Sequence, residues 1–380
     1  MASLPAPLQQ IDRTWVVCQG RRFSFFGGCD YFRLSSDRRV VDTLERATRR
    51  YGISTSASRL TSGNHELYEE VEQAAARYFG FPAATLVSNG YAANLIAAQA
   101  LVGEFQSLWM DERSHSSVQL AAELLTAGRV DEHRFRYRDA THLRELAQSP
   151  RAAAQSPGVG VLLTDGLFAH SGAVAPLSDY RPLLRAGDWL WIDDAHGAGT
   201  LGKHGRGVLD GIQWPVSRTL LVTTFSKAFG AYGGVILSSA SVRRRILASS
   251  HFFAGNTPPP LPVVAAALES MKVLTAEGDV LRDRLRRNTA LVRGFVRDAG
   301  APMWDTPGPI LGVTTVTPRA ATRLEQSMRK AGILAPRICY PGAPSEGYFR
   351  IVISSEHTES QLNSLGSTLA AHASDLVCLL

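Results

Sequence analysis

A carboxylate, an imidazole and an amine stand where short apolar runs of the sequence end. Asp193 closes the run Trp189–Asp193, His196 comes three residues later, and Lys227 comes shortly after the run Leu220–Phe225. In open α/β sheets, ligands bind beyond the carboxyl ends of the strands, so these side chains could share one site. Each of these residues taken alone can also be explained by a structural role, because an Asp-Asp-x-His segment also fits a loop cap or a salt bridge.

Together these residue types match the needs of pyridoxal phosphate (PLP) chemistry. PLP requires a lysine amine for its Schiff base and an anionic partner for its pyridinium nitrogen. Lys227 and Asp193 supply these two groups, and His196 could donate a hydrogen bond to the ring hydroxyl. The sequence therefore predicts a PLP site built on Lys227.

A second segment predicts a phosphate site. Gly90 and Tyr91 come directly before the helix-like stretch Ala92–Leu101. The free N–H groups at a helix N-terminus bind anions, and a glycine lets the backbone approach closely. Thr224, three residues before Lys227, can add a hydroxyl to the same phosphate.

The middle of the chain alternates short apolar runs with helix-like stretches. Continuous apolar strands separated by helices predict a mainly parallel sheet covered on both faces. The predicted strands are Ala84–Ser88, Leu108–Asp111, Val159–Thr164, Trp189–Asp193, Leu220–Phe225 and Gly234–Ser238, with helices that include Ala92–Leu101 and Val118–Thr126.

The last hundred or so residues follow another pattern, which predicts a separate α+β lobe. Helices are expected at Asp279–Asp298, Arg319–Ala331 and Glu359–Ala371, and strands at Ile310–Val316 and Tyr348–Ser354. We therefore predict an N-terminal arm with a short helix (1–45), a large PLP-binding domain (46–270) and a small C-terminal α+β domain (271–380).

Composition narrows the class of protein. Hydrophobic residues make up 45% and charged residues 19% of the chain, which is ordinary for a globular enzyme. The net charge of +6 either helps attract anionic substrates or reflects a slightly basic surface. We expect no nucleic acid partner, no secretion signal and no membrane span. Cys18, Cys29, Cys339 and Cys378 lack CxxC spacing, which argues against a metal or disulfides and fits a cytoplasmic protein.

Several motifs occur in one collinear order along nearly the whole chain. With them the sequence resembles the α-oxoamine synthase family, which has the aspartate-aminotransferase-like fold of PLP enzymes. The resemblance implies a fold type I transferase, with a seven-stranded, mainly parallel sheet in the large domain. The motifs are Asp30-Tyr31, Ser58-Arg59-Leu60, Ser88-Asn89-Gly90-Tyr91-Ala92-Ala93-Asn94, Asp111 with His115-Ser116-Ser117, Ala175-Pro176-Leu177, Asp193-Asp194-Ala195-His196-Gly197, Gly202 with Gly205-Arg206-Gly207, Thr224-Phe225-Ser226-Lys227-Ala228-Phe229-Gly230, and Arg350.

The resemblance implies further site residues. His115 matches the histidine that stacks on the PLP ring and assists proton transfer, although alone it also reads as a surface histidine that caps a helix. Arg350 matches the arginine that binds the amino-acid carboxylate, and strand alternation places it opposite Phe349 and Ile351. Thr257 matches a residue that reaches the phosphate of the neighbouring subunit, or else it is a turn residue. A homodimer with shared active sites is implied.

The chain departs from the family pattern in two places. In the segment that begins at Asp165, Ala169 lacks the hydroxyl expected near the ring oxygen, and Ser171 replaces an acid. His170 either offers a polar group toward the ring or faces solvent. Cys29 replaces the asparagine expected near the substrate carboxylate. These changes leave Lys227 and its anionic and histidine partners in place, so they bear on the substrate more than on the cofactor.

The resemblance implies the decarboxylative condensation of an amino acid with an acyl thioester. We expect L-alanine and a pimeloyl thioester, carried by CoA or by an acyl carrier protein, which would place the enzyme in biotin biosynthesis. A related synthase that uses glycine or serine with another acyl-CoA stays open, as does an aminotransferase or lyase of the same fold. A non-catalytic scaffold subunit should lack Lys227. A nicotinamide dehydrogenase should carry GxGxxG after its first strand, and Gly197-x-Gly199 with Gly202 is a weak match.

Overall fold

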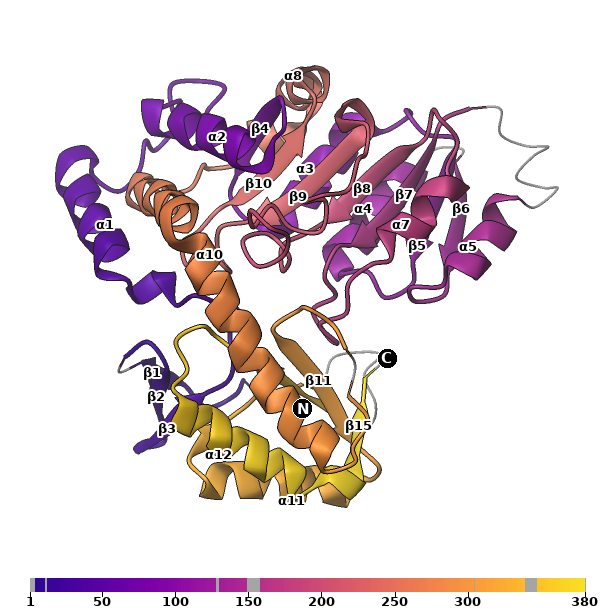
Figure 1. Cartoon of the computed structure of the whole chain (residues 1–380). Coiled ribbons are helices and arrows are strands. Elements are labelled where there is room, and N and C mark those ends of the chain that lie inside the picture. Colours follow the sequence, from indigo (N-terminus) through magenta and orange to yellow (C-terminus); the bar gives the residue numbers. More distant parts are fainter. Residues whose placement is uncertain are drawn as a thin grey trace. The chain divides into compact units, whose positions relative to one another are not determined.

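The computed structural model describes residues 4–10, 12–127, 130–148, 158–303, 305–338 and 347–379, so Cys339 lies outside the described residues. The chain forms two compact units (Figure 1). The large unit comprises Arg38–Phe168 and Val174–Gly278. The small unit comprises Met1–Asp37, Ala169–Ala173 and Asp279–Leu380. The domain boundaries given above stay a prediction.

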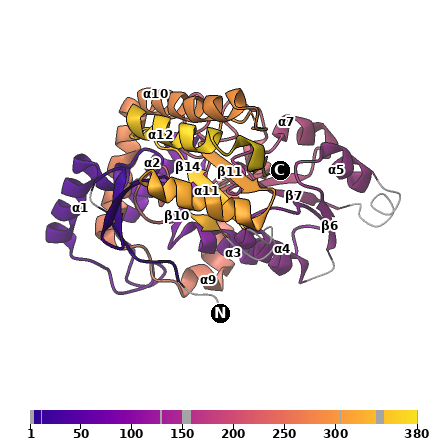
Figure 2. The ribbon, with the colours of Figure 1, turned by 90° about the horizontal axis from the view of Figure 1, so that it is seen from below.

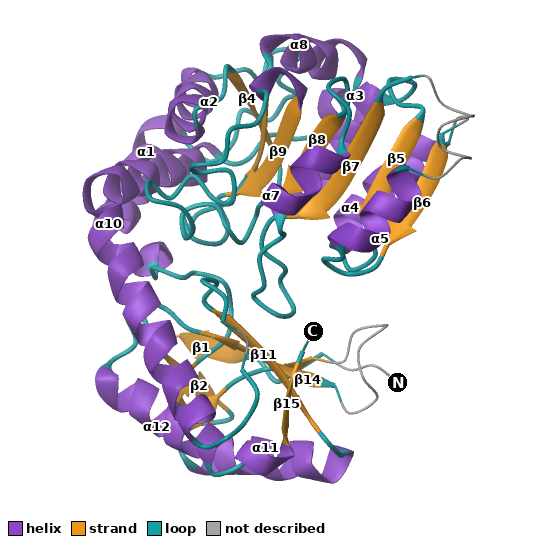
Figure 3. Cartoon of the chain, turned by 45° about the vertical axis from the view of Figure 1, so that its right-hand side comes forward, coloured by secondary structure: helices purple, strands orange, loops and turns teal. Residues whose placement is uncertain are grey.

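A seven-stranded sheet forms the centre of the large unit, as predicted (Figure 3). Its order is β4-β10-β9-β8-β7-β5-β6, where β10 runs antiparallel to both neighbours and the other pairs are parallel. The strands are β4 (Ala83–Val87), β5 (Ser107–Asp111), β6 (Asp131–Phe135), β7 (Gly160–Asp165), β8 (Trp189–Asp193), β9 (Thr219–Thr224) and β10 (Gly234–Ser238).

Helices cover both faces of this sheet. In Figure 3, α5 and α7 lie in front of the strands and α3 and α4 lie behind them. The helices of the large unit are α1 (Arg38–Tyr51), α2 (Glu66–Phe79), α3 (Gly90–Leu101), α4 (Ser116–Thr126), α5 (Ala140–Ala147), α7 (Leu177–Tyr180), α8 (Ala240–Ser249) and α9 (His251–Ala254), with the short η2 (Arg181–Leu183) and η3 (Val216–Arg218).

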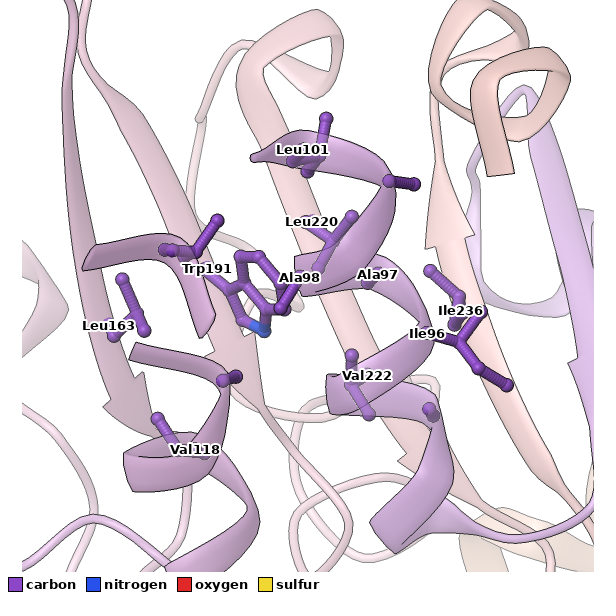
Figure 4. Packing of buried hydrophobic residues seen from close by; sticks show 14 of the residues in the cluster. Ile96, Ala97, Ala98, Leu101, Val118, Leu163, Trp191, Leu220, Val222 and Ile236 are labelled. Atoms are coloured by element: carbon purple, nitrogen blue, oxygen red, sulfur yellow. The ribbon is translucent and has the colours of Figure 1, made fainter. Parts of the chain in front are cut away.

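The main core of the large unit lies between the sheet and the helices α3 and α4 (Figure 4). Trp191 and Val222 project from β8 and β9 toward Ile96 and the alanines of α3, and Leu163 of β7 lies on the side of α4, where Val118 packs. Side chains two residues apart on a strand share a face. The apolar face therefore continues, at the carboxyl end of each strand, into a polar residue that the same two helices approach.

The small unit contains two four-stranded sheets, in the orders β1-β2-β3-β12 and β13-β14-β11-β15. Figure 2 shows α11 and α12 side by side, and their leucines pack with those of the second sheet. Its elements are β1 (Leu8–Gln10), β2 (Trp15–Cys18), β3 (Arg21–Phe25), η1 (Leu34–Ser36), β11 (Ile310–Thr315), α11 (Pro318–Lys330), β12 (Ile333–Leu334), β13 (Arg337–Ile338), β14 (Tyr348–Val352), α12 (Glu359–Ala370), η4 (Ala373–Asp375) and β15 (Leu376–Cys378).

Two elements differ from the sequence prediction. The predicted N-terminal arm contains a β-hairpin, β2 and β3, whose turn residues Gln19 and Gly20 both have positive φ. Such a turn matches the twist of the strands, although Gln-Gly is a weaker signal than Asn-Gly. The helix expected to start at Asp279 begins much earlier, since α10 extends over Leu261–Asp298 and contributes residues to both units.

In the described part of the chain, every helix is too short or too polar to cross a lipid bilayer.

A buried histidine joins the N-terminal strands to the C-terminal part of the small unit. His357 stacks on Phe26 with 4.1 Å between the ring centroids, and its Nε2 lies 3.0 Å from the carbonyl oxygen of Phe25. Its Nδ1 accepts a hydrogen bond from the backbone N–H of Ser354. Burial, reinforced by the charge of Arg33, lowers the pKa of His357 to about 3.

We predict that His357 makes the free energy of unfolding depend on pH. Its pKa is about 3 in the folded chain and about 6.5 when unfolded. The unfolded state therefore binds the extra proton, and stability falls as the pH drops below about 6.5 toward 3. Between about pH 7 and 5 the wild type should lose about 2 kcal/mol more than His357→Gln in urea unfolding. Equal losses in the two proteins would contradict this.

Candidate active site

The register of the parallel strands brings the candidate residues to one edge of the large unit's sheet. Asp165, the last residue of β7, is paired with Asp193, the last residue of β8. Asp193 is in turn paired with Val222 of β9, two residues before Thr224. These polar side chains follow the apolar face described above, so they lie beside the N-terminal ends of α3 and α4.

A cavity of about 270 Å³ lies at this edge. Seven of the predicted site residues line it, namely Gly90, Tyr91, His115, Asp193, His196, Thr224 and Lys227. Residues to which the sequence assigned no role also line it, among them Ser117, Asp165 and Ser226. Thr257 lies outside this lining.

Lys227 reaches the cavity from the turn after β9. Its Nζ lies 2.8 Å from Nε2 of His196, and the lysine is half-buried. A hydrogen bond at this distance needs one donor and one lone pair, so the two groups do not both hold a full set of protons. The chain has four lysines, all of them described, and Lys227 is the one among the cavity residues.

Asp193 is buried and held by two donors. Its Oδ2 accepts a hydrogen bond of 2.7 Å from Nδ2 of Asn94, and its Oδ1 accepts one of 3.1 Å from the backbone N–H of Ala195. Asn94 also contacts Ser117 and Trp191. The sequence motif includes Asn94, but only the packing of α3 on the sheet reveals this contact.

Two further carboxyl groups near Asp193 have pKa values well above the ordinary range. Burial raises the pKa of Asp165, and the negative charge of Asp193 raises it further. Burial is also the main cause of the raised pKa of Asp194. Their neutral forms are therefore favoured, which limits the negative charge gathered at this edge.

The N-terminus of α3 presents backbone donors to the cavity. Asn89 caps this helix, since its side chain accepts from the N–H of Ala92 and its carbonyl accepts from the N–H of Ala93. The first N–H groups of a helix have no acceptor within the helix, and here they belong to Gly90 and Tyr91 in the cavity wall. Such a terminus binds phosphate groups.

Thr224 lies against this helix terminus. Its hydroxyl lies 2.8 Å from the carbonyl oxygen of Gly233 and 2.8 Å from the hydroxyl of Ser226. A Cβ on Gly90 would stand 3.1 Å from the Cβ of Thr224. The glycine is therefore what allows the helix to start this close to β9.

His115 caps a helix, as one of its two sequence interpretations predicts, and it also lines the cavity, while its stacking on PLP stays a prediction. Its Nδ1 accepts from the backbone N–H of Ser117 and so caps α4, while its ring lines the cavity. Its own backbone N–H donates to Oδ1 of Asp165 at 2.9 Å. The ring of Tyr91 meets that of His115 edge-on, with 6.0 Å between centroids.

Thr257 is exposed and follows Asn256, whose side chain donates a hydrogen bond of 2.9 Å to the hydroxyl of Ser88. The segment is thus attached next to the cap of α3. The predicted contact of Thr257 with a partner subunit stays a prediction.

Arg350 and Cys29 belong to the small unit. Arg350 lies on β14 between Phe349 and Ile351, which point into the core, as strand alternation predicts. Its Nε donates to the carbonyl oxygen of Ala169 at 2.6 Å, and its Nη2 lies 3.3 Å from Sγ of Cys29. Two of the residues that depart from the family pattern therefore contact this arginine directly.

The other two departures are placed as follows. The hydroxyl of Ser171 accepts a hydrogen bond from the backbone N–H of Ala173, so it stabilises the local turn. His170 is half-buried rather than fully exposed to solvent.

The donor set of the cavity fits PLP. An amine can bind the aldehyde, a buried carboxylate can pair with the pyridinium nitrogen, and a helix N-terminus can bind the phosphate. In this chain those groups are Lys227, Asp193 and the start of α3, and all three line one cavity.

Comparison with known proteins agrees with this geometry. The model of the family "Aminotransferase class I and II" matches residues 30–369. An 8-amino-7-oxononanoate synthase of Stutzerimonas stutzeri is 32% identical over 358 residues, covering 93% of this chain and 89% of the relative. The chain belongs to the α-oxoamine synthase family.

Members of this family are PLP-dependent enzymes of the acyltransferase type, and PLP is the cofactor. A second relative, the 8-amino-7-oxononanoate synthase of Nitrosococcus oceani, is 30% identical and covers 92% of this chain and 91% of its own length. A solved serine palmitoyltransferase variant of S. paucimobilis with bound PLP and myriocin has a TM-score of 0.88 at 24% identity, covering 97% of this chain and 92% of that one. The shared fold is that of fold type I PLP enzymes.

We predict that Gly234→Ala weakens PLP binding. A Cβ at Gly234 would overlap the carbonyl group of Asn89 and displace the start of α3. Crowding of this kind costs about 1–3 kcal/mol of unfolding free energy, and losing about 1.4 kcal/mol of phosphate binding raises the Kd about tenfold. Absorbance titration with PLP and urea unfolding measure the two effects.

The matched control is Gly187→Ala, because a Cβ there would meet no atom within 4 Å. That variant should bind PLP like the wild type. A Gly234→Ala protein with an unchanged Kd would show that the position of α3 does not determine phosphate binding.

Proposed function

We propose that this enzyme condenses L-alanine with a pimeloyl thioester of CoA or of an acyl carrier protein, giving 8-amino-7-oxononanoate, CO₂ and the free thiol. The observation that carries the proposal is the near full-length similarity to 8-amino-7-oxononanoate synthases at 30–32% identity. The cavity supports it, because Lys227 lines it together with the histidines and the carboxylate that the family reaction needs.

In this proposal the residues of the large unit hold the cofactor. They are Lys227, Asp193, His196, His115, Gly90, Tyr91 and Thr224, with Thr257 acting toward the partner subunit of a homodimer. When bound, PLP supplies an electron sink for the carbanion at Cα of the amino acid. The proposal includes a homodimer with shared active sites and a cytoplasmic location.

Lys227 acts as the base that removes the Cα proton of alanine. A lysine can do this only as a neutral amine, and its contact with Nε2 of His196 at 2.8 Å orients the amine. Removal of the proton leaves an electron pair on Cα, which forms the new C–C bond to the thioester carbonyl carbon. The C–S bond breaks, and the sulfur takes up a proton as the thiol leaves.

Asp193 supplies the fixed negative charge for the pyridinium nitrogen. Its two hydrogen bonds, from Asn94 and from the backbone of Ala195, hold the carboxyl group in place. In a buried site this charge acts more strongly than it would in water.

Arg350 and Cys29 are proposed to bind the substrate carboxylate. A guanidinium group has five N–H donors in a fixed fork, so Arg350 can bind a carboxylate while Ala169 and Cys29 hold two of its nitrogens. The carboxylate later leaves as CO₂, and the carbon that loses it takes up a proton.

An aminotransferase is the second candidate function, because the matching family model is that of the class I and II aminotransferases. In that reaction, alanine alone would convert the enzyme-bound cofactor to pyridoxamine phosphate and release one equivalent of pyruvate.

We predict that the PLP-loaded enzyme releases free thiol from pimeloyl-CoA with L-alanine, and much less with glycine or L-serine. Mass spectrometry should identify 8-amino-7-oxononanoate, and labelled alanine should yield labelled CO₂. Thiol release with glycine or serine instead would contradict the choice of L-alanine, and stoichiometric pyruvate from alanine alone would support the aminotransferase.

Two lysine variants control this assay. Lys227→Ala should lower the turnover by at least about 10²-fold, since positioned proton transfer contributes on the order of 10²–10⁴. Lys203→Ala, at an exposed lysine outside the cavity lining, should keep the wild-type rate.

A further inference from the structure

A chain of hydrogen bonds behind the cavity begins at Trp191. An indole N–H can only donate, and Nε1 of Trp191 lies 3.0 Å from Oδ1 of Asn94. The amide oxygen of Asn94 is therefore turned toward the indole. Its Nδ2 is left to donate to Oδ2 of Asp193 at 2.7 Å and to Oγ of Ser117 at 3.0 Å.

The chain continues through Ser117 to His115. Because Oγ of Ser117 accepts from Asn94, its own hydrogen can go to Nδ1 of His115, which lies 2.8 Å away. The backbone N–H of Ser117 points to the same Nδ1 at 3.2 Å. A backbone N–H can only donate, so Nδ1 of His115 accepts and carries no proton.

A neutral imidazole has one N–H, so the proton of His115 is on Nε2. We propose that Trp191, Asn94 and Ser117 fix His115 in the Nε2–H tautomer, so that in its neutral form His115 donates a hydrogen bond into the cavity rather than accepting one. Ser117 and Asn94 are then positioning residues that act through His115.

Because Asn94 and Ser117 are buried, their hydrogen bonds cannot be exchanged for hydrogen bonds to water. Asn94 is 0% and Ser117 1% exposed, so water cannot substitute for a lost partner at either residue. A reversed Asn94 amide would direct its N–H₂ group at the indole N–H and its oxygen at the Asp193 carboxylate, which loses both hydrogen bonds. The same amide thus orients Asp193 and, through Ser117, His115.

The tautomer of His115 is inferred from the hydrogen bonds alone. Only the role of its Nε2–H toward a substrate rests on the proposed function. A ring that offers Nε2–H can donate a hydrogen bond to a substrate oxygen, such as a carboxylate or thioester carbonyl oxygen, and can stabilise negative charge on it. In this tautomer the neutral ring cannot accept the Cα proton. Its Nε2 already carries a proton, and its Nδ1 accepts from both the hydroxyl and the backbone N–H of Ser117. The Cα proton is then left to Lys227, and neutral His115 acts as a hydrogen-bond donor to the substrate.

The test is ¹⁵N NMR of the PLP-loaded enzyme with labelled histidine, at about pH 8, where an ordinary imidazole is neutral. The signal of His115 is assigned by its loss in His115→Gln. We expect a pyridine-like shift for Nδ1 and a pyrrole-like shift for Nε2. His204 is an internal reference of the opposite kind, because its Nδ1 lies 3.2 Å from the Asp210 carboxylate and should carry the proton.

The variant Ser117→Ala removes the hydroxyl and keeps the backbone N–H. It should move the two ring-nitrogen shifts of His115 toward each other, while Ser116→Ala, at the exposed neighbouring serine, should leave them unchanged. A protonated Nδ1 in the wild type, or unchanged shifts in Ser117→Ala, would overturn the proposal. Because the readout does not involve turnover, an enzyme that shows the expected shifts but makes no 8-amino-7-oxononanoate would contradict the proposed function alone.

Discussion

The site depends on placing one carboxylate, Asp193, in a buried position at the end of the middle strand of the large sheet. Parallel register pairs it with Asp165, so two acids end side by side where α3 and α4 begin. Burial and the neighbouring charge raise the pKa of Asp165, while Asn94 and a backbone N–H hold Asp193. The remaining features of the cavity, the amine of Lys227 and the helix terminus at Gly90, surround this anion.

Sequence patterns predicted those site residues whose place in the site follows from where they stand along a strand. Asp193 and Lys227 follow apolar runs, and parallel strands end at one edge, so their placement in one cavity follows from strand direction. The orientation of Arg350 on β14 was predicted correctly from strand alternation, whereas the seven-stranded sheet was implied by the family resemblance, since the apolar runs gave six of its strands and missed β6. Strand alternation and the positions of strand ends are properties of short segments.

Contacts between distant segments could not be predicted in this way. Asn94 reaches Asp193 only because the alanines of α3 let that helix pack closely on the sheet, over β9 and β10, and no spacing in the sequence encodes this distance. The hairpin at Gln19 and Gly20 was missed because its turn lacks a strong signal. The first half of α10 was missed because its apolar residues are not confined to one face, so it lacks a clear amphipathic pattern.

The most direct test of the central claim is to locate the cofactor on the chain. The holoenzyme is reduced with borohydride, which makes the link between PLP and its lysine permanent, and the digested protein is mapped by mass spectrometry. The chain has four lysines, so the assignment is unambiguous. We predict that the phosphopyridoxyl group is found on Lys227. Finding it on Lys203, Lys272 or Lys330, or finding no modified peptide, would contradict the account.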